Sequence, residues 1–349
     1  MEIVSLKLRN YRNHRSLYQE FDSGLNVIVG ANGVGKSNII EAIALLATTR
    51  SFRTSDYRNI IEHNREFAAV EGDCDNKKLR IVISKMGRRF QCDQNPIKTS
   101  SDFIGLFQAV VFTPEDLNFV TSSPKFRRRL IDSELSKVNK KYLRNLSEFS
   151  TILKNRNALL KQEKFDENLL EVTDDRMAEL MAAISAERNN YLKDINELYS
   201  LKLNELMSQP RSVKLENKST CNGLSKEEII QQLKSYRLRD TITKQSNFGI
   251  QRDDYQILYA GYNAAAYCSQ GQIRLLMIAL KLVLANLVKQ LTNATPLILL
   301  DDVLSELDLQ HQRNLLHQIY QKNQTIITAT HLDKTLDDLD KKVIELRRT

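Results

Sequence analysis

The sequence predicts an α/β fold whose sheet is interrupted along the chain by an inserted helical lobe. Residues 1–110 read as alternating strands and helices, and this pattern returns over residues 269–349. Between them, residues 125–209 contain neither glycine nor proline and keep a helical period of apolar residues. Apolar runs closed by glycine or by acids indicate the parallel strands of the sheet.

The first strong element is a strand followed by a glycine-rich loop and a helix. Residues 25–29 form an apolar run closed by glycine, and residues 38–47 have one apolar helix face. The loop between them reads G-x-x-x-x-G-K-S, the pattern of the P-loop that binds nucleotide phosphates. A chance match in a glycine-rich turn is the alternative, which the agreement of strand, loop and helix disfavours.

This loop has the chemistry that phosphate binding needs. Its glycines let successive N–H groups point at phosphate oxygens, and the helix N-terminus adds partial positive charge. Lys36 would reach the outer phosphates, and Ser37 would ligate Mg²⁺. The predicted ATP-binding residues here are Gly30, Ala31, Asn32, Gly33, Val34, Gly35, Lys36 and Ser37.

A second apolar run ends in two acids. Residues 297–300 read Leu-Ile-Leu-Leu and are followed by Asp301 and Asp302. A parallel strand delivers side chains in this way to the carboxyl edge of a sheet, where α/β proteins bind ligands. We expect Asp301 to hold the magnesium ion with Ser37, and Asp302 to polarise a water for attack on the γ-phosphate. The predicted catalytic residues are Lys36, Asp301 and Asp302. A helix N-cap beside a surface charge is the alternative for the two acids taken alone.

A third motif precedes an apolar helix expected from about residue 273 to residue 288. Ser269-Gln270-Gly271-Gln272 resembles the S-G-G-Q signature of ABC-type ATPases, and Ser305-Glu306-Leu307-Asp308 resembles their D-loop. In such proteins the signature of one subunit covers the γ-phosphate held by the P-loop of another. The resemblance therefore implies that Ser269, Gly271 and Gln272 contact nucleotide across a dimer. A capping box of Ser269 and Gln272 is the alternative for this motif taken alone.

Four further residues are candidates for the same site. Arg12 follows the first predicted strand, where an arginine approaches the nucleotide base in some ABC-type ATPases, or else it is a solvated surface residue. His331 follows the strand of residues 325–328, where ABC-type enzymes carry a histidine that senses the γ-phosphate, or else it is a plain loop histidine. Gln108 and Glu115 both fit the loop residue that ligates Mg²⁺ or positions water.

The inserted segment reads as a short antiparallel helical hairpin. Apolar residues from Leu135 to Leu160 fall near a and d positions, a polar break follows at residues 162–168, and a return helix extends to Leu206. Residues 121–170 hold twelve Lys and Arg against six Asp and Glu. This basic segment could follow a nucleic-acid backbone or form a solvated helix face. The predicted DNA-binding residues are Arg127, Arg128, Arg129, Lys140, Lys141 and Arg144.

Composition limits the class of protein. The chain has 349 residues, a formal net charge of +8 and a pI near 9.1, so an anionic partner is favoured. Its four cysteines show neither zinc-ligand spacing nor a disulfide framework. The N-terminus does not resemble a signal peptide, and no stretch approaches eighteen uninterrupted apolar residues. We expect a cytoplasmic protein without a membrane partner.

Taken together, these motifs resemble the RecF family of bacterial recombination mediators, short relatives of the SMC-type repair ATPases. The resemblance covers essentially the whole chain. The segments that carry it include residues 8–13, 30–37, 49–54, 112–117, 127–129, 251–254, 269–274 and 299–308. One departure is Gln251, because the family usually has histidine before Arg-Asp-Asp. The resemblance implies an ABC-type P-loop ATPase head, lobe I, over residues 1–120 and 250–349, with lobe II inserted as residues 121–249.

The resemblance also implies a function in recombinational DNA repair and replication restart. Two subunits would close around ATP and Mg²⁺ as a homodimer, and weak, DNA-stimulated hydrolysis would act as a switch. Implied partners are DNA with single-strand/double-strand junctions, the mediators RecR and RecO, and RecA, which they help to load. The alternative is the nucleotide-binding subunit of a membrane transporter, which shares the P-loop, signature and acidic strand. The helical insert argues against it.

Overall fold

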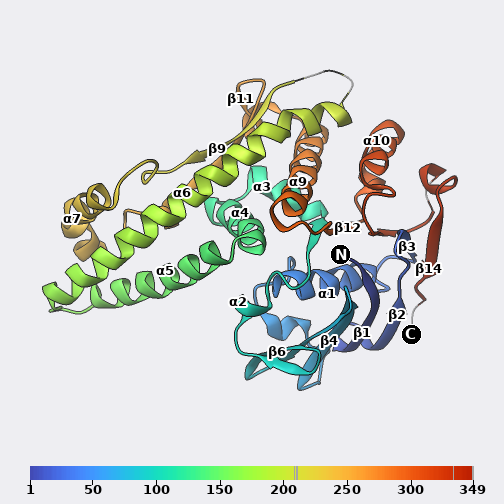
Figure 1. Cartoon of the computed structure of the whole chain (residues 1–349), viewed down its shortest axis with the longest axis horizontal. Coiled ribbons are helices and arrows are strands. Elements are labelled where there is room, and N and C mark those ends of the chain that lie inside the picture. The colour runs from blue at the N-terminus through green and yellow to red at the C-terminus, as the bar shows by residue number, and fades with distance from the viewer. Residues whose placement is uncertain (208, 210, 333, 348–349) are drawn as a thin grey trace. The chain divides into compact units, whose positions relative to one another are not determined.

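The computed structural model describes residues 1–207, 209, 211–332 and 334–347, and it divides into two compact units. The head unit comprises Met1–Leu117, Leu201–Pro210 and Gln270–Thr349. The helical unit comprises Asn118–Ser200 and Arg211–Ser269. Segments from both ends of the chain, blue and red in Figure 1, therefore belong to the head unit.

One sheet of the head unit is antiparallel and has the strand order β2-β1-β4-β5-β6-β7. Its strands are β1 (Ile3–Tyr11), β2 (His14–Glu20), β4 (Phe67–Cys74), β5 (Lys77–Ser84), β6 (Gly87–Cys92) and β7 (Asn95–Ile97). From β4 to β7 each strand pairs with the next through a short turn. This run contains no crossover helix, so the alternation of strands and helices predicted over residues 1–110 is wrong there. Antiparallel neighbours need only a tight turn.

The second sheet of the head unit is parallel and has the order β14-β3-β13-β12-β8. Its strands are β3 (Leu25–Val29), β8 (Ala109–Phe112), β12 (Leu297–Asp301), β13 (Thr325–Ala329) and β14 (Lys341–Glu345). Because all five strands run the same way, their carboxyl ends lie along one edge of the sheet. We call this line the carboxyl edge.

Helix α1 (Lys36–Thr48) packs between the two sheets, as its contacts with β1, β4, β8, β12 and β13 show. Residues 39–47 are all buried, and they join apolar residues of both sheets in one core. A helix covered on both sides needs apolar residues all round, which explains its near-continuous apolar sequence. Glu41 is the exception, and it is completely buried.

Helix α9 (Gln270–Thr292) is the long apolar helix predicted after the signature-like motif. By length and composition this helix could cross a membrane. However, 78% of its apolar 18-residue window is buried inside the structure. Burial of this kind is typical of a core helix. The remaining head elements are α2 (Ser100–Phe103), α10 (Leu309–Ile319) and the 3-10 turns at Tyr57–Ile60, Pro114–Leu117, Leu304–Glu306 and Lys334–Leu336.

The helical unit is built around a hairpin of α5 (Lys140–Leu159) and α6 (Glu167–Leu206) (Figure 1). Ion pairs from Arg156 to Asp174 and from Arg176 to Glu148 fix its antiparallel register. Its other elements are α3 (Asn118–Thr121), α4 (Pro124–Val138), α7 (Lys226–Thr243), α8 (Ala264–Tyr267), β9 (Val213–Lys218), β10 (Asp254–Tyr259), β11 (Tyr262–Asn263) and the 3-10 turn Ile250–Arg252.

The hairpin differs from the prediction at Asn139. One continuous first arm was expected, but α4 ends and α5 begins at this residue. Asn139 has an extended backbone, and its Oδ1 accepts the Tyr142 N–H at 2.9 Å as the N-cap of α5. Asparagine is among the strongest N-cap residues, so a local hydrogen bond overrides the continuous apolar period.

The second border of the helical unit also differs from the predicted one. The sequence predicts residues 250–269 in the head, but the structure places them in the helical unit. The reason is strand pairing, because β10 lies between β9 and β11 in a three-stranded antiparallel sheet. Long-range strand pairing of this kind leaves no local trace in the sequence. The sequence also predicts residues 201–210 in the inserted lobe, but the structure places Leu201–Pro210 in the head unit, where Leu206 O accepts a hydrogen bond from Asn314 Nδ2 of α10.

Candidate nucleotide-binding site

The glycine-rich loop joins β3 to α1 at the carboxyl edge. Gly33 and Gly35 have φ values of +81° and +109°, which residues with side chains rarely adopt. At Gly35 space is also limiting, since an added Cβ would lie 2.7 Å from Asn13 Oδ1. The predicted glycine positions are therefore required by backbone conformation and by close packing.

Lys36 turns back over this loop. It is largely buried, and its Nζ donates to Gly30 O at 2.6 Å and to Ala31 O at 3.1 Å. Ala31, Asn32 and Gly33 are exposed, whereas Val34 is buried and anchors the loop. The loop thus keeps its first residues at the surface and holds an ammonium group against them.

The turn between β1 and β2 contacts two carbonyls of the phosphate-binding loop through Asn13 and His14, which we call the clamp. No motif in the sequence predicts this contact. Asn13 Nδ2 donates to Val34 O at 3.1 Å, and His14 Nε2 lies 3.2 Å from Gly35 O. Burial lowers the pKa of His14, so the ring is neutral at pH 7 and the Nε2 proton is donated to that carbonyl. Two carbonyls of the phosphate-binding loop are therefore held from outside, which fixes the loop's curvature.

Asp301 lies beside Ser37, as predicted. The Ser37 hydroxyl donates to Asp301 Oδ1 at 2.8 Å, and the Thr328 hydroxyl donates to the same oxygen at 2.8 Å. Burial raises the pKa of Asp301, and these two hydrogen bonds oppose the rise. A serine hydroxyl and a carboxylate are hard oxygen donors of the kind that Mg²⁺ prefers.

Asp302 has an unusual backbone. Its φ is +53°, in the left-handed region, and its N–H donates to Thr328 Oγ1 at 3.0 Å. Aspartate tolerates this region better than most residues with side chains, and such conformations cluster at functional sites. The Thr328 hydroxyl thus contacts both acids, because it donates its proton to the Asp301 carboxylate and accepts the Asp302 N–H. From the sequence, Thr328 is predicted only as part of a strand.

The direction of strand β8 decides whether Gln108 or Glu115 lies at the candidate site. Gln108 precedes β8, and its carbonyl accepts the Leu297 N–H at the start of β12, so it lies at the amino end of the sheet. Glu115 follows β8 at the carboxyl edge, and its charge is one of the causes that raise the pKa of Asp301. The structure therefore brings Glu115, and not Gln108, to the candidate site.

Arg12 is bound to the buried carboxylate of helix α1. Its Nε and Nη2 form a two-pronged pair with Glu41 at 2.9 and 2.6 Å, and its Nη1 donates to Asn59 O at 2.7 Å. The Ser51 hydroxyl also donates to Glu41 Oε1, at 2.5 Å. Arg12 therefore links the β1–β2 turn to the helix that follows the phosphate-binding loop.

The remaining candidates are exposed or half-buried. Ser269 and Gly271 are exposed where α9 begins, and Gln272 is half-buried. His331 is exposed two residues after β13, and its Nδ1 lies 3.0 Å from the Thr330 hydroxyl. His331 thus follows a strand that ends at the carboxyl edge.

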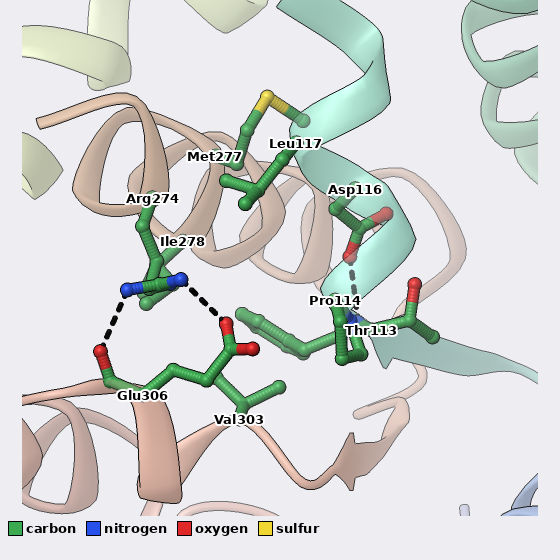
Figure 2. Close-up of a pocket in the computed structure, with 10 residues that line it drawn as sticks. Thr113, Pro114, Asp116, Leu117, Arg274, Met277, Ile278, Val303 and Glu306 are labelled. Atoms are coloured by element: carbon green, nitrogen blue, oxygen red, sulfur yellow. Dashed lines mark hydrogen bonds and ion pairs between the residues drawn. The ribbon is translucent and has the colours of Figure 1, made fainter. Parts of the chain in front are cut away.

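A small pocket of the head unit lies between α9 and the loop after β8 (Figure 2). Arg274, one turn into α9, donates to Glu306 O and pairs with Glu306 Oε2, both at 2.7 Å. Two turns further along, Lys281 pairs with Asp116 at 2.9 Å. Helix α9 therefore holds both the D-loop-like segment and the loop that carries Glu115.

Comparison with known proteins identifies the family. The model of the RecF/RecN/SMC N terminal domain matches residues 2–347. The DNA replication and repair protein RecF of Acholeplasma laidlawii is 36% identical over 329 residues, which cover 94% of this chain and 93% of that protein. Its counterpart in Lachnoclostridium phytofermentans is 36% identical over 346 residues, 97% of this chain and 95% of that protein. The chain belongs to the RecF family.

Solved structures agree with this assignment. A structure of the recombination mediator protein RecF with ATP, in the RecFOR pathway, matches at a TM-score of 0.90 and 31% identity, covering 97% of this chain and 93% of that one. A Pyrococcus furiosus Smc head domain matches at 0.56 and 18% identity, covering 99% and 94%, which shows a shared fold. The predicted fold class, an ABC-type head with an inserted helical lobe, is confirmed. Membership of this family of DNA replication and repair proteins also decides against the transporter alternative.

In this RecF-family chain, two arginines of the basic segment (residues 121–170) already have partners within the protein. Fewer of its charges are therefore available to DNA than the sequence suggests. Arg127 forms a two-pronged pair with Asp254 at 2.6 and 3.0 Å, and Arg128 donates to Asp253 O. Arg129, Lys140, Lys141 and Arg144 are exposed. The first two arginines thus have internal partners, which argues against the DNA contacts predicted for them.

Gln251, the departure from the RecF-family pattern, has a local role. Its Nε2 donates to Phe248 O at 2.7 Å. An added Cβ at Gly249 would lie 2.6 Å from Gln251 Oε1, and Gly249 has a φ of +126°. Gln251 therefore closes the turn before β10.

Proposed function

We propose that this chain binds ATP with Mg²⁺ at the carboxyl edge and acts as a nucleotide-controlled recombination mediator in DNA repair. The observation that carries the proposal is the Ser37–Asp301 hydrogen bond, which joins two motifs 264 residues apart. It supports the proposal because Mg²⁺ in P-loop proteins is held by the loop's serine and by an acid at the end of a strand. Family membership supports it independently.

Each residue of the edge has a defined role in this proposal. Lys36 and the loop N–H groups bind the phosphates, and Ser37 and Asp301 hold Mg²⁺, which neutralises charge on the phosphate oxygens when bound. Mg²⁺ usually keeps several waters and takes one or two protein carboxylates. The described residues contain no cluster of three or more His, Cys, Asp and Glu, so a dedicated metal cage is not part of the proposal. Asp302 acts as the base that orients the attacking water.

The mediator role is proposed in the following form. Ser269, Gly271 and Gln272 of one subunit complete the ATP site of a second copy, with His331 near the γ-phosphate, so ATP closes a homodimer. Closure shapes a surface that binds DNA backbone near single-strand/double-strand junctions, and slow hydrolysis releases it. RecR- and RecO-like mediators and RecA are the proposed partners, in the cytoplasm. A relative with 31% identity is described with ATP and in the RecFOR pathway, which supports these choices.

The ATP site is tested with Lys36→Met. Removing the ammonium group should raise the Kd for ATP by roughly 10- to 100-fold, the range expected for charged hydrogen bonds. Titration of a fluorescent ATP analogue measures it. Lys85→Met is the matched control, because Lys85 is exposed elsewhere in the head unit and should leave the Kd unchanged. Wild-type affinity in Lys36→Met would overturn the proposal.

The dimer is tested with Ser269→Arg. This variant should bind ATP as the wild type does but remain a monomer when ATP is added, because only the partner's nucleotide meets the new side chain. Light scattering after gel filtration gives the mass with and without ATP. Ser147→Arg, at an exposed position of α5, is the control. ATP-dependent dimerisation of Ser269→Arg would show that the signature does not act across a dimer.

A further inference from the structure

The segment that follows Asp302 is held from two sides of the head unit. It bends through a 3-10 turn before α10 begins. On one side, the buried Gln312 of α10 donates from Nε2 to Leu304 O at 2.8 Å. On the other side, Arg274 of α9 donates to Glu306 O. Two helices therefore set the path of the chain after Asp302, and one of them begins at the signature-like motif.

The contact between Arg274 and Glu306 has two points (Figure 2). Nη1 donates to the backbone carbonyl of Glu306, and Nη2 pairs with its Oε2, both at 2.7 Å. The side chains of this ion pair are 21% and 34% exposed, so solvent weakens it. A hydrogen bond to the main chain fixes the path of the segment directly. We therefore expect the backbone hydrogen bond to be the more important of the two.

A small cavity adjoins this contact. It has a volume of about 20 Å³, and its walls are largely apolar, among them Met277, Ile278 and Val303 (Figure 2). A space of this size is room for about one water molecule. Apolar packing between α9 and the residue after Asp302 is therefore incomplete here. Arg274 supplies a directional contact that packing alone does not.

The anchored segment is joined to Asp302 by local hydrogen bonds. The Ser305 hydroxyl donates to Asp302 O at 2.8 Å, and the Glu306 N–H donates to Val303 O at 3.3 Å. Asp302 itself has a φ of +53°, a conformation that a residue with a side chain keeps only where its surroundings fix it. One hydrogen-bonded turn thus connects the anchor point of Arg274 with the proposed base.

We propose that Arg274 is a positioning residue for ATP hydrolysis, which holds the turn after Asp302 so that this carboxylate orients the attacking water. Arg274 lies one turn into the helix that begins at Gln270, directly after Ser269. Contact of the signature-like motif with the nucleotide of a second copy is then passed through α9 and Arg274 to Asp302, which links hydrolysis to closure of the dimer. This inference rests on the proposed ATP-binding function.

Arg274→Met, compared with Arg313→Met, tests this role. Arg313 is exposed on α10, and its replacement should leave ATP turnover unchanged. Arg274→Met should lower kcat roughly 10-fold, because a small misplacement of a reacting group is enough for such a loss. The Kd for ATP and the mass of the ATP-bound dimer should stay at their wild-type values, because the phosphate-binding loop and Ser269 are unchanged. Arg274→Lys, which keeps the charge but not the two-point contact, should lose less.

Two double variants test the route by which Arg274 acts. Glu306→Gln keeps the main-chain acceptor and removes only the partly exposed ion pair, so kcat should fall less than about 3-fold. Arg274→Met/Glu306→Gln should be no slower than Arg274→Met, because both changes act on one contact. Arg274→Met should also cause no further loss when it is added to Asp302→Asn. Losses that multiply in this last variant would overturn the route through Asp302.

The outcomes separate this inference from the proposed function. Wild-type kcat in Arg274→Met, or in Asp302→Asn, would overturn the role of Arg274 and leave the ATP site standing. Loss of the ATP-dependent dimer in Arg274→Met would assign the residue to assembly and also overturn it. A wild-type protein that neither binds nor hydrolyses ATP would overturn the proposed function itself. Melting curves of all variants identify unfolding, and Arg274→Lys supplies the turnover test if the methionine variant unfolds.

Discussion

Charged residues are arranged in opposite ways at the carboxyl edge of the head and inside the helical unit. In the helical unit, Arg156 is completely buried and bridges Asp174 and Asp240 at 2.6 and 2.7 Å, and Arg188 is held in the same way by Asp132 and Asp253. At the carboxyl edge, Asp302 has no ion-pair partner among the residues that the structure describes. Paired charges fix the structure, whereas unpaired charges at a sheet edge remain available to a ligand.

Breaking a pair in the helical unit should have the largest effect on stability. Arg156→Met leaves Asp174 and Asp240 buried without their main partner. Removing one member of a buried ion pair costs about 3–5 kcal/mol, because the remaining charge is desolvated and unbalanced. Denaturant unfolding at pH 7 measures the loss.

Arg144→Met on the same helix is the control for Arg156. Arg144 is exposed and should change the free energy of unfolding by less than about 0.5 kcal/mol, as is usual for surface positions. Equal losses of unfolding free energy in Arg156→Met and Arg144→Met would show that the position on α5, and not the buried ion pairs of Arg156, determines stability.

The carboxyl edge should show the reverse pattern, a large loss of activity at little cost in stability. Asp302→Asn keeps size and shape but removes the carboxylate that is proposed to orient the attacking water. ATP turnover should fall by roughly 10²-fold or more, the scale expected for loss of a general base, while the Kd for ATP stays near the wild-type value. The variant should also accumulate as the ATP-bound dimer.

The same substitution at another aspartate of the head is the control for the loss of turnover in Asp302→Asn. Asp338→Asn, at an exposed position of the head unit, should leave turnover unchanged. If Asp302→Asn hydrolyses ATP at the wild-type rate, the base lies elsewhere, and Glu115 at the same edge becomes the next residue to test.

The sequence predicted the carboxyl edge better than its surroundings, for a physical reason. Strand ends and glycine spacing are local patterns, so Lys36, Ser37 and Asp301 could be brought together without coordinates. The clamp formed by Asn13 and His14 depends on a turn whose partners lie 21 residues away, and no local pattern marks it. One signal was available, because Glu41 interrupts an otherwise apolar helix. A buried carboxylate requires a partner, which proved to be Arg12.

The basic segment shows the opposite case, in which a strong local pattern of charge omits the long-range partners of two of its arginines. Arg127 and Arg128 stand in a run of three arginines, but the acid that pairs with Arg127 lies 127 residues further along the chain. Charge counts over a window cannot include such a partner. The motif Arg-Asp-Asp after Gln251 supplies both partners: the carboxylate of Asp254 pairs with Arg127, and the backbone carbonyl of Asp253 accepts a hydrogen bond from Arg128.

Thr328 offers an intermediate test, because it positions both acids of the edge without an assigned contact to the nucleotide. Thr328→Val removes a hydrogen bond that lowers the pKa of Asp301, so this pKa rises and the carboxylate is protonated at higher pH. The acid side of the pH–activity profile should move to higher pH, and turnover should fall roughly 10-fold, as for other residues that orient metal ligands.

Two variants distinguish this positioning role from simple damage to strand β13. Thr325→Val removes a buried hydroxyl at the other end of the strand, where it donates to Asn323 O, and should leave the pH profile unchanged. Thr328→Ser keeps the hydroxyl and should restore the wild-type profile. An unchanged acid side in Thr328→Val would show that Thr328 does not control the ionisation of Asp301.

The smallest expected effect is on DNA binding. Here the comparison between paired and unpaired charges predicts how steeply the affinity depends on salt. Lys141 and Arg144 are exposed on one side of α5, so the double variant Lys141→Ala/Arg144→Ala should remove about two phosphate contacts. If the protein neutralises about five phosphates in its ATP-bound form, log K falls with log[salt] at a slope of about −4 to −5. The double variant should make that slope less steep by about 2 and weaken binding roughly 3- to 10-fold near physiological salt.

Arg127→Ala is the matched comparison, since it removes a guanidinium that is already paired with Asp254. It should leave the salt slope within about half a unit of the wild type, because no phosphate contact and therefore no counterion release is lost. Anisotropy titrations of a labelled junction DNA with ATP, at several salt concentrations, measure both slopes. A larger change of slope in Arg127→Ala than in the double variant would show that the Arg127–Asp254 pair opens when DNA binds, so that pairing in the free protein does not decide which arginines reach the backbone.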